Sequence, residues 1–368
     1  MNEKKDCIKL LKIVAGCFVG GLLLIGIFVW TIDPLYHYHA PLFRLPIVLE
    51  DAVYQTAGAA RNLEYDSAIV GTSMTENMHT SWFDEEMGWN TMKLSYSGAR
   101  SSDLKAIFGQ MSRKEGKLEN MVMDLNDYQL TVPSWTKYVE HPAYLYDRSL
   151  LNDYEYLYNH DIVVRCVARF LDGMRGVKDN IDTAYTWEED SLFGKEIALE
   201  TSRDIREQHL QDKDNNIEEA YLVSGMLSDN IEEKLQVCQE NLDNILPFLE
   251  ENPDTEVHVM IPPYSMLYWE EKVLSGELEN ILAIYAYAVE KLLQYDNVRV
   301  YYFQNEWDII TNLDNYRDSC HHRPEYNRYM FECIRDGKNE ITLQNYQTLL
   351  QEMYDFAKDY PYVDLWAE

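Results

Sequence analysis

The sequence DSAIVGTSMTEN, from Asp66 to Asn77, is the clearest indication of fold class in this 368-residue chain. Its first five residues are mostly small or branched apolar residues, which is typical of a short buried β-strand. Gly71 ends the strand, and Thr72 or Ser73 can cap the helix that the next residues favour. A buried strand that turns directly into a helix is the repeating unit of parallel α/β sheets.

Short apolar runs that have the character of buried strands recur along the chain. Including the first, they lie at 66–70, 91–95, 119–124, 255–260 and 297–302. Stretches with a helical spacing of apolar residues lie beside them, at about 50–62, 76–87, 100–114, 229–250, 276–295, 324–335 and 342–359. This alternation predicts an α/β fold with about five parallel strands, covered by helices on both faces.

One region interrupts this alternation. Residues from about 134 to 228 are rich in Tyr, Asp, Glu and Asn, and they contain helical pieces such as 150–175 but no strong strand. We expect a helical insertion between the third and fourth strands. Insertions at the carboxyl ends of parallel strands commonly build a substrate site.

The N-terminus has the pattern of a membrane anchor. From Ile13 to Ile32, twenty consecutive residues carry no charge, and four lysines precede them. At 1.5 Å per residue this run spans roughly 30 Å, the thickness of a bilayer's hydrocarbon core. Positive charge on the short side predicts a cytoplasmic N-terminus. We therefore expect a cytoplasmic tail at 1–12, a single-pass transmembrane signal anchor at 13–32, a juxtamembrane segment and first helix at 33–60, and an extracellular domain at 61–368.

Two other interpretations of this segment stay open beside the favoured anchor. A cleaved signal peptide would have a shorter apolar core and a small-residue cleavage site, and neither is clear here. Val14-Ala15-Gly16-Cys17 resembles a bacterial lipoprotein box. However, few apolar residues precede Cys17, and the apolar run continues well past it.

The chain is strongly acidic. Acidic residues outnumber basic ones by 63 to 32, for a net charge of −31, and residues 34–368 alone carry −32. This charge argues against nucleic acid as a partner, because phosphate backbones are bound by clustered Lys and Arg. It also fits a neutral glycan better than a polyanion held by electrostatics alone. Four cysteines of the outer part could pair, although their spacing suggests neither a disulfide framework nor a zinc site: Cys166, Cys238, Cys320 and Cys333.

Ser73 has the position of a nucleophile. It follows a buried strand and begins a helix, so its own N–H and the helix dipole can face a developing oxyanion. The alternative is that Ser73 or Thr72 only caps the helix. The motif lacks the second glycine of G-x-S-x-G and is therefore not the elbow of an α/β-hydrolase.

A serine nucleophile needs a base, and the base needs an orienting group. The stretch NYRDSCHHRPE, residues 315–325, places Asp318 and His321 three residues apart, after the fifth strand and before a terminal helix. This D-x-x-H spacing favours His321 over His322 as the base. Cys320 is better explained as a small packed residue than as a second nucleophile.

Taken together and in order, these blocks resemble the SGNH, or GDSL-type, hydrolases. The resemblance runs from about residue 60 to 335 as short blocks. It implies a flavodoxin-like three-layer α/β/α sandwich in which a serine attacks an ester, with Ser73, His321 and Asp318 as the triad. It also implies an oxyanion hole made by Ser73, by Gly98 after the second strand and by Asn126 after the third.

The chain departs from the family pattern at two positions. Block one reads Gly-Thr-Ser, with Thr72 in place of Asp, and block three has Asp124 where the family usually has Gly. With an anchor in front, the chain looks closest to membrane-anchored SGNH-like proteins that handle acyl groups on extracellular polymers, such as those of alginate acetylation and teichoic acid D-alanylation. That likeness implies an acylated carbohydrate or cell-surface polymer as substrate, and a multi-pass membrane acyl-exporting protein as partner.

Further candidates for substrate contact are Tyr264 and Ser265, which follow the fourth strand, and Asn77, which follows the nucleophile. A rigid turn or a helix cap explains them equally well. The sequence offers no metal motif and no glycine-rich cofactor loop, so we expect neither a metal nor a cofactor.

Three functions remain to be weighed. The first is a membrane-anchored serine esterase or O-acyltransferase acting on acetyl-type esters at the cell surface. The second is a catalytically inactive protein of the same fold that serves as a scaffold or glycan-binding subunit of a cell-envelope assembly. The third is a receptor-like ectodomain with a different α/β topology.

Overall fold

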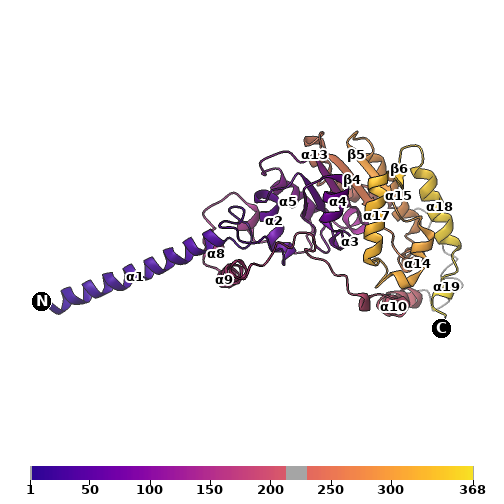
Figure 1. The fold of residues 1–368 in the computed structure, drawn as a ribbon. Coiled ribbons are helices and arrows are strands. Elements are labelled where there is room, and N and C mark those ends of the chain that lie inside the picture. The colour runs from indigo at the N-terminus through magenta and orange to yellow at the C-terminus, as the bar shows by residue number, and fades with distance from the viewer. Residues whose placement is uncertain (1, 213–229, 368) are drawn as a thin grey trace. The chain divides into compact units, whose positions relative to one another are not determined.

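The computed structural model describes residues 2–212 and 230–367, and within them the chain forms two compact units (Figure 1). Unit 1 comprises Met1–Glu64, Gly109–Glu115 and Val139–Ile181. Unit 2 comprises Tyr65–Phe108, Gly116–Tyr138 and Asp182–Glu368. All six cysteines lie in the described part, and each is a free thiol.

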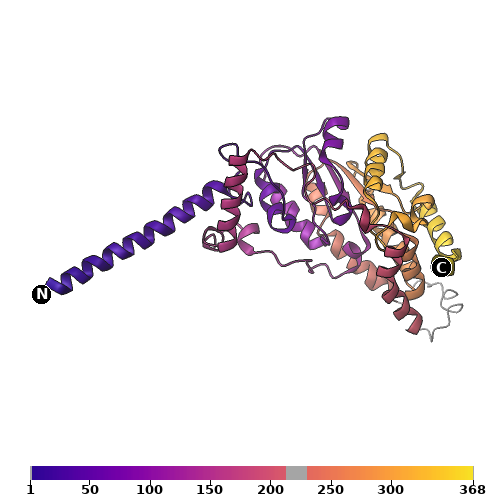
Figure 2. The same ribbon diagram turned by 60° about the horizontal axis from the view of Figure 1, so that its bottom comes forward.

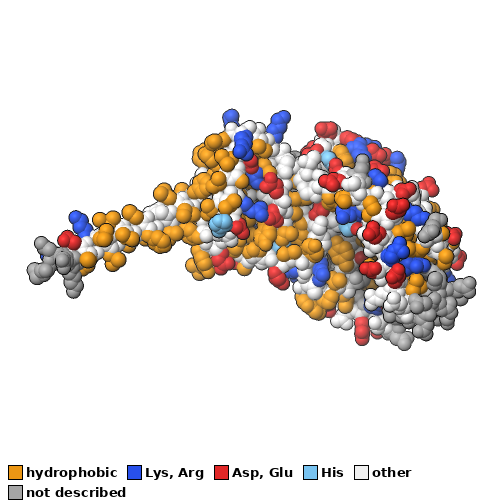
Figure 3. All heavy atoms as spheres, turned by 90° about the horizontal axis from the view of Figure 1, so that it is seen from below, with side chains coloured by type: hydrophobic (Ala, Val, Ile, Leu, Met, Phe, Trp, Pro, Cys, Tyr) orange, Lys and Arg blue, Asp and Glu red, His pale blue; other side chains and the backbone are white. Residues whose placement is uncertain are grey.

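Unit 1 is helical and contains the expected apolar segment. Its helices are α1 (Asn2–Ile32), α2 (Ala52–Asn62), α7 (Ala143–Tyr146), α8 (Tyr154–Leu157) and α9 (His160–Arg175). Over Lys5–Ile32, α1 is long and apolar enough to cross a bilayer, and a signal sequence would have the same character. Hydrophobic side chains cover α1 along its length (Figure 3). Only its carboxyl end is buried, where Val29 and Ile32 pack with Tyr156 and Cys166.

Unit 2 is built on a six-stranded sheet. The strands are β1 (Ser67–Val70), β2 (Thr91–Lys93), β3 (Asn120–Asp124), β4 (Glu256–Ile261), β5 (Val298–Tyr302) and β6 (Glu340–Ile341). Their order is β2-β1-β3-β4-β5-β6, and every pairing is parallel except that of β5 with β6. The five strands expected from the sequence are therefore confirmed, and β6 adds a short antiparallel edge.

The order of the parallel strands is that of the flavodoxin-like fold. After β2 the chain crosses from one side of β1 to the other, because β3 pairs with the opposite edge of β1. In open α/β sheets, ligands bind beyond the carboxyl ends of the strands at this switch point. Ser73 follows β1 and Asn126 follows β3, so both lie at that position.

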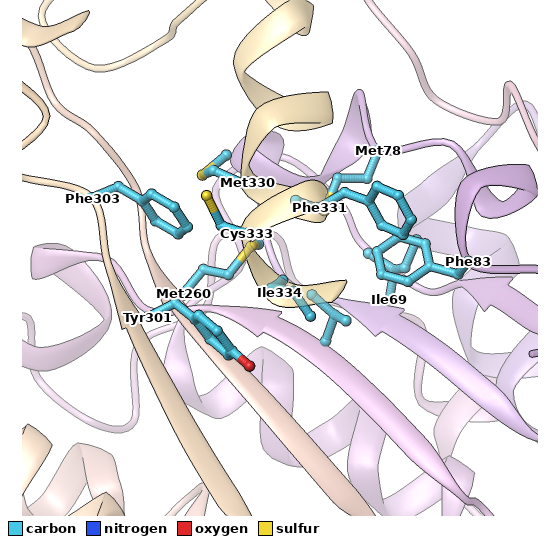
Figure 4. Close-up of a cluster of buried hydrophobic side chains, with 11 residues drawn as sticks. Ile69, Met78, Phe83, Met260, Tyr301, Phe303, Met330, Phe331, Cys333 and Ile334 are labelled. Atoms are coloured by element: carbon cyan, nitrogen blue, oxygen red, sulfur yellow. The ribbon is translucent and has the colours of Figure 1, made fainter. Parts of the chain in front are cut away.

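Helices cover both faces of the sheet (Figures 1 and 2). On one face, α4 (Thr80–Met87) and α17 (Pro324–Asp336) pack Phe83 and Phe331 onto Ile69, Val122 and Met260 (Figure 4). The other layer contains α5 (Ser101–Met111), α12 (Ile231–Leu242), α13 (Leu246–Glu251) and α15 (Leu278–Leu292). Strand residues are buried on both faces in consequence, as the continuous apolar runs predict.

The remaining elements of unit 2 are short helices at the strand ends and helices at the chain's end. They are α3 (Ser73–Glu76), α6 (Asp127–Thr131), η1 (Asp190–Leu192), α10 (Lys195–Asp212), α14 (Met266–Ser275), α16 (Trp307–Ile310), η2 (Leu313–Asn315), α18 (Tyr346–Asp359) and α19 (Tyr362–Leu365). The region expected as one helical insertion at 134–228 contains helices joined by irregular segments, and no strand, where it is described, with α7 to α9 in unit 1 and α10 in unit 2. Its part at 213–228 lies outside the described residues.

Candidate active site

The carboxyl edge of the sheet in unit 2 encloses a cavity of about 560 Å³. Residues that follow β1, β2, β3, β4 and β5 all contribute to its wall. They are Ser73, Met74, Ser97, Gly98, Asn126, Asp127, Tyr128, Tyr138, Trp187, Tyr264, Arg317, Asp318, Cys320 and His321. All three predicted triad residues are in this set. Gly98 and Asn126, the other candidates for the oxyanion hole, are in it too.

The turn after β1 fixes the position of Ser73. Thr72 is the N-cap of α3, and its hydroxyl accepts the Met74 N–H at 3.2 Å, so Ser73 is the first residue of the helix. Gly71 has φ +148°, and a Cβ there would lie 1.7 Å from Oδ1 of Asp124. The glycine is therefore required for β1 to approach the end of β3 so closely.

Ser73, His321 and Asp318 lie in one hydrogen-bonded line. Oγ of Ser73 is 2.8 Å from Nε2 of His321, and Nδ1 of His321 is 2.7 Å from Oδ2 of Asp318. The other carboxylate oxygen of Asp318 accepts the backbone N–H groups of Cys320 and His321 at 2.8 and 2.7 Å. Burial raises the pKa of Asp318, but these bonds outweigh burial and hold the pKa below its ordinary value. The carboxylate is thus ionised and can orient the imidazole and stabilise its protonated form.

Neighbouring residues fix the loop that carries the histidine. Tyr316 and His322 form an isolated antiparallel bridge, and the Arg317 N–H donates to the His321 carbonyl at 3.0 Å. His322 is buried, and burial lowers its pKa to about 4, so it stays neutral. Its Nδ1 lies 3.1 Å from the Arg323 carbonyl and not beside Ser73. Burial also raises the pKa of the Cys320 thiol well above its ordinary value, which leaves it un-ionised.

Two backbone N–H groups at the cavity lack an acceptor. Among the described residues, neither the Ser73 N–H nor the Gly98 N–H donates a hydrogen bond. Gly98 has φ +72°, and a Cβ there would lie 2.5 Å from the ring of Tyr138. Unpaired N–H groups at partly buried positions are rare in folded proteins, and two of them beside a serine suit an incoming oxyanion.

Asn126 is placed differently from these two donors. Its amide nitrogen donates to Oγ1 of Thr72 at 3.1 Å and to Oδ2 of Asp124 at 2.5 Å, and its carbonyl oxygen accepts from the Tyr264 hydroxyl. In this arrangement the amide holds the turn, and its expected oxyanion role stays a prediction. The two departures from the resembled motif, Thr72 and Asp124, are partners: the Asp124 carboxylate accepts both the N–H and the hydroxyl of Thr72.

The other predicted substrate contacts are largely structural. Tyr264 lines the cavity but is only 1% exposed, with its hydroxyl committed to Asn126. Ser265 is fully buried, caps α14, and donates to the Ser319 carbonyl at 2.9 Å. Asn77 is also buried, and its side-chain oxygen accepts the Trp187 N–H at 2.8 Å. Substrate binding by these residues stays a prediction.

Glu76 connects segments that lie far apart in the sequence, and the sequence alone does not reveal its contacts. It is 5% exposed and accepts the Ser97 hydroxyl on both carboxylate oxygens, at 3.0 and 2.8 Å, and the Trp187 indole N–H at 3.1 Å. Burial raises its pKa, and the bonds from Ser97 and Trp187 oppose this rise. Ser97 precedes Gly98, and the Trp187 ring meets His321 edge-on, with centroids 5.3 Å apart. One side chain thus joins the glycine loop to the wall beside the histidine.

Lys93 secures the segment that carries Trp187. Its Nζ donates to the carbonyls of Glu76, Asp182 and Ala184 at 2.9, 3.2 and 2.9 Å. The lysine side chain is fully buried at the end of β2, and burial lowers its pKa to about 7. No spacing rule connects Lys93 or Glu76 with residues more than 85 positions away, so only the folded chain shows this network.

Within the described residues, no three His, Cys, Asp or Glu side chains are grouped as a metal site would require. No protein-family model and no curated protein matches the sequence. Among solved structures, the chain is similar to one from Streptococcus pneumonia that is described provisionally as a platelet activating factor. The identity is 11%, the TM-score is 0.39, and the match covers 78% of this chain and 90% of that one. A likeness this distant says nothing about activity, so the chemistry has to be inferred from the site itself.

Proposed function

We propose that this protein is a serine esterase or O-acyltransferase of the SGNH type that acts on acyl, acetyl-type esters. The observation that carries the proposal is the line from Ser73 through His321 to Asp318, with separations of 2.8 and 2.7 Å, at a cavity with two unpaired N–H groups. A nucleophile, an oriented base and oxyanion donors around one space are the components of acyl transfer.

In the first half of the reaction, Oγ of Ser73 attacks the ester carbonyl while Nε2 of His321 takes the serine proton. The negative charge on the carbonyl oxygen is stabilised by the N–H groups of Ser73 and Gly98. When the tetrahedral intermediate collapses, the C–O bond of the ester breaks and His321 returns the proton to the leaving alcohol. The acyl group is then bound to Ser73.

In the second half, an acceptor hydroxyl attacks the acyl-enzyme. His321 takes the proton of the acceptor, the bond to Oγ breaks, and the proton returns to Ser73. A water acceptor gives hydrolysis, and a sugar or polyol hydroxyl gives transfer. Asp318 stays ionised throughout, because its low pKa favours the carboxylate at neutral pH.

For the cellular setting, we propose that α1 anchors the protein in the cell membrane, with the N-terminus in the cytoplasm and the rest of the chain outside. The twenty uncharged residues after four lysines support this topology. The substrate would then be an acylated carbohydrate or other cell-surface polymer. A multi-pass membrane protein that exports acyl groups would be a fitting partner.

A second candidate is an inactive protein of this fold that binds glycans or organises an envelope assembly. The observation that favours it concerns Asn126, whose amide is bonded to Thr72 and Asp124. Of the three expected oxyanion donors, only the two backbone N–H groups then stay unpaired at the cavity. A site that only binds a glycan does not need an activated serine.

A covalent probe separates the two candidates. The full-length chain in detergent is treated with a fluorophosphonate, and the labelled residue is identified by mass spectrometry. We expect labelling on Ser73, none in Ser73→Ala, and much slower labelling in His321→Gln because the base is lost. Equal labelling of wild type and Ser73→Ala would contradict the esterase proposal and favour the binding protein.

A further inference from the structure

The charged residues that line the cavity in unit 2 are not balanced. Two of them are carboxylates that already have partners: Asp127 lies 3.2 Å from Nζ of Lys272, and Asp318 binds His321. Arg317 is the one Lys or Arg in the described cavity wall. Within the described residues, no carboxylate lies within 4.0 Å of its guanidinium. The cavity therefore contains one positive charge without a counter-charge.

The acidic chain supplies carboxylate partners to several other arginines of unit 2. The chain has 63 acidic residues, and other arginines of unit 2 use them: Arg206, Arg299 and Arg328 each lie 2.6–2.9 Å from a glutamate. A charge without a partner at a partly buried position has a desolvation cost that a bound anion would offset.

Arg317 is also held in position. Its backbone N–H donates to the His321 carbonyl at 3.0 Å, and its carbonyl accepts the Thr201 hydroxyl at 3.2 Å. Its guanidinium carbon lies 5.4 Å from the centre of the Trp187 ring, within the range of a cation–π contact. A guanidinium that lies over a ring and is carried by a bonded backbone can direct its N–H groups to two oxygens of one carboxylate or phosphate.

We infer that Arg317 binds an anionic oxygen group, a carboxylate or a phosphate, that the substrate carries close to its ester bond. The inference rests on the proposed function, because it takes the cavity to be the ester site. It also modifies the expectation, drawn from the net charge, that a neutral glycan fits the protein better than a polyanion. The field of the acidic surface is screened within about 8 Å at physiological salt, so it does not decide what binds beside one local guanidinium.

The test compares aryl acetates that differ in one group. Phenyl acetate is neutral, 4-acetoxybenzoate carries a carboxylate, and 4-acetoxyphenyl phosphate carries a phosphate. With the full-length chain in detergent, kcat/KM is measured for wild type, Arg317→Gln and Arg317→Lys. The ratio of anionic to neutral ester is then compared between proteins, because the intrinsic difference in leaving-group reactivity is the same in each and cancels.

We expect Arg317→Gln to lower this ratio about tenfold or more for the carboxylate ester, the phosphate ester or both, because a charge-assisted pair is lost. The ratio for Arg317→Lys should lie between those of wild type and Arg317→Gln, since lysine keeps the charge but not the paired N–H groups. Arg323→Gln is the matched control, because Arg323 also lies over an aromatic ring, 5.3 Å from the centre of Phe193, but outside the cavity wall. Equal ratios in wild type and Arg317→Gln would overturn the inference, as would an equal loss on neutral and anionic esters.

A binding measurement separates this inference from the proposed function. In Ser73→Ala, which cannot form an acyl-enzyme, calorimetry compares binding of 4-acetoxybenzoate and phenyl acetate. Preference for the anion that disappears in the double variant Ser73→Ala/Arg317→Gln supports the role of Arg317, whether or not wild type turns over either ester. Absence of any preference contradicts it, even if Ser73 proves to be the nucleophile.

Discussion

Each unit of the molecule contains a buried carboxylate surrounded by hydrogen-bond donors, and the two clusters differ in what they leave unpaired. In unit 1, Asp33 follows α1 and accepts the N–H groups of His37, Tyr38 and His39 at 2.9, 2.6 and 3.0 Å, and the Tyr156 hydroxyl at 2.6 Å. The Leu35 N–H donates to the Tyr156 hydroxyl and the Tyr36 N–H to the Asp33 carbonyl, so every backbone N–H from residue 35 to 39 has an acceptor.

In unit 2, Asp124 is equally buried and accepts three hydrogen bonds, from the N–H and the hydroxyl of Thr72 and from the amide of Asn126. However, the adjacent Ser73 N–H and the nearby Gly98 N–H have no acceptor among the described residues, and both border a cavity. A closed polar cluster stabilises a turn, whereas a cluster with donors to spare beside a cavity can bind a ligand. The following variants test this distinction.

Ser73→Ala should reduce kcat for an acetyl ester by about 10⁶-fold, because the acyl-enzyme can no longer form. The fold should not change, since Ala is a good helix former at this position. Ester turnover and circular dichroism of the purified full-length chain measure the two effects. Turnover within tenfold of wild type would mean that Ser73 is not the nucleophile.

Asp318→Asn should lower kcat by about 10⁴-fold, because the imidazole loses the carboxylate that orients it. The variant also tests the lowered pKa of Asp318. A depressed pKa means that the stability supplied by the ionised form is present above the ordinary value of 3.8 and is lost as the pH falls through the lower folded value. The difference in unfolding temperature between wild type and Asp318→Asn should therefore shrink below pH 4. A difference that grows with acidification would contradict the assigned shift.

Gly98→Ala should cost about 10²–10³-fold in kcat, because the new Cβ conflicts with the Tyr138 ring and displaces an oxyanion donor. The matched control is Gly276→Ala, which has nearly the same φ, +74° against +72°, but open space around the added Cβ. The control should lose about 1 kcal/mol of stability and no activity. Equal activity of the two variants would remove Gly98 from the proposed oxyanion hole.

Glu76→Gln should reduce kcat by at most about 10²-fold with little change in KM, since small displacements of catalytic groups have effects of this size. Its stability should vary with pH in a defined direction. The folded pKa of Glu76 is raised, so stability from its protonated form is present below the ordinary value of 4.5 and is lost as the pH rises through the folded value. As the pH rises through that window, the unfolding temperature of Glu76→Gln should therefore increase relative to that of wild type. An unchanged kcat would show that the Ser97 and Trp187 bonds do not position the site.

Asp33→Asn should leave ester turnover unchanged and destabilise unit 1 by about 1–3 kcal/mol, because an amide cannot accept all four donors. Thermal unfolding followed by circular dichroism measures the loss. Asp161→Asn, at an exposed position in the first turn of α9, is the control and should change neither property. Lost activity in Asp33→Asn would show that the closed cluster also supports the site.

The sequence predicted well what short-range patterns determine. The five buried strands and their helices follow from apolar runs, and the nearness of Ser73 to the D-x-x-H loop follows from the rule that parallel strands end at one edge. The contacts of Glu76, Lys93 and Trp187 could not be predicted, because they join segments through side-chain directions that no local pattern encodes. Asn126 shows the same limit: its position after β3 was predictable, but not the partners of its amide.

The route of the chain gives the cavity wall one more property. The backbone leaves unit 2 at Tyr138, passes through residues 139–181 of unit 1, and returns at Asp182, five residues before Trp187. Two aromatic residues of the wall, Tyr138 and Trp187, therefore lie at the ends of a single excursion, and Lys93 and Asn77 bind the segment in which the chain returns. The Trp187 side of the cavity is thus held by bonds to backbone atoms, which do not depend on the side chains of residues 182 and 184.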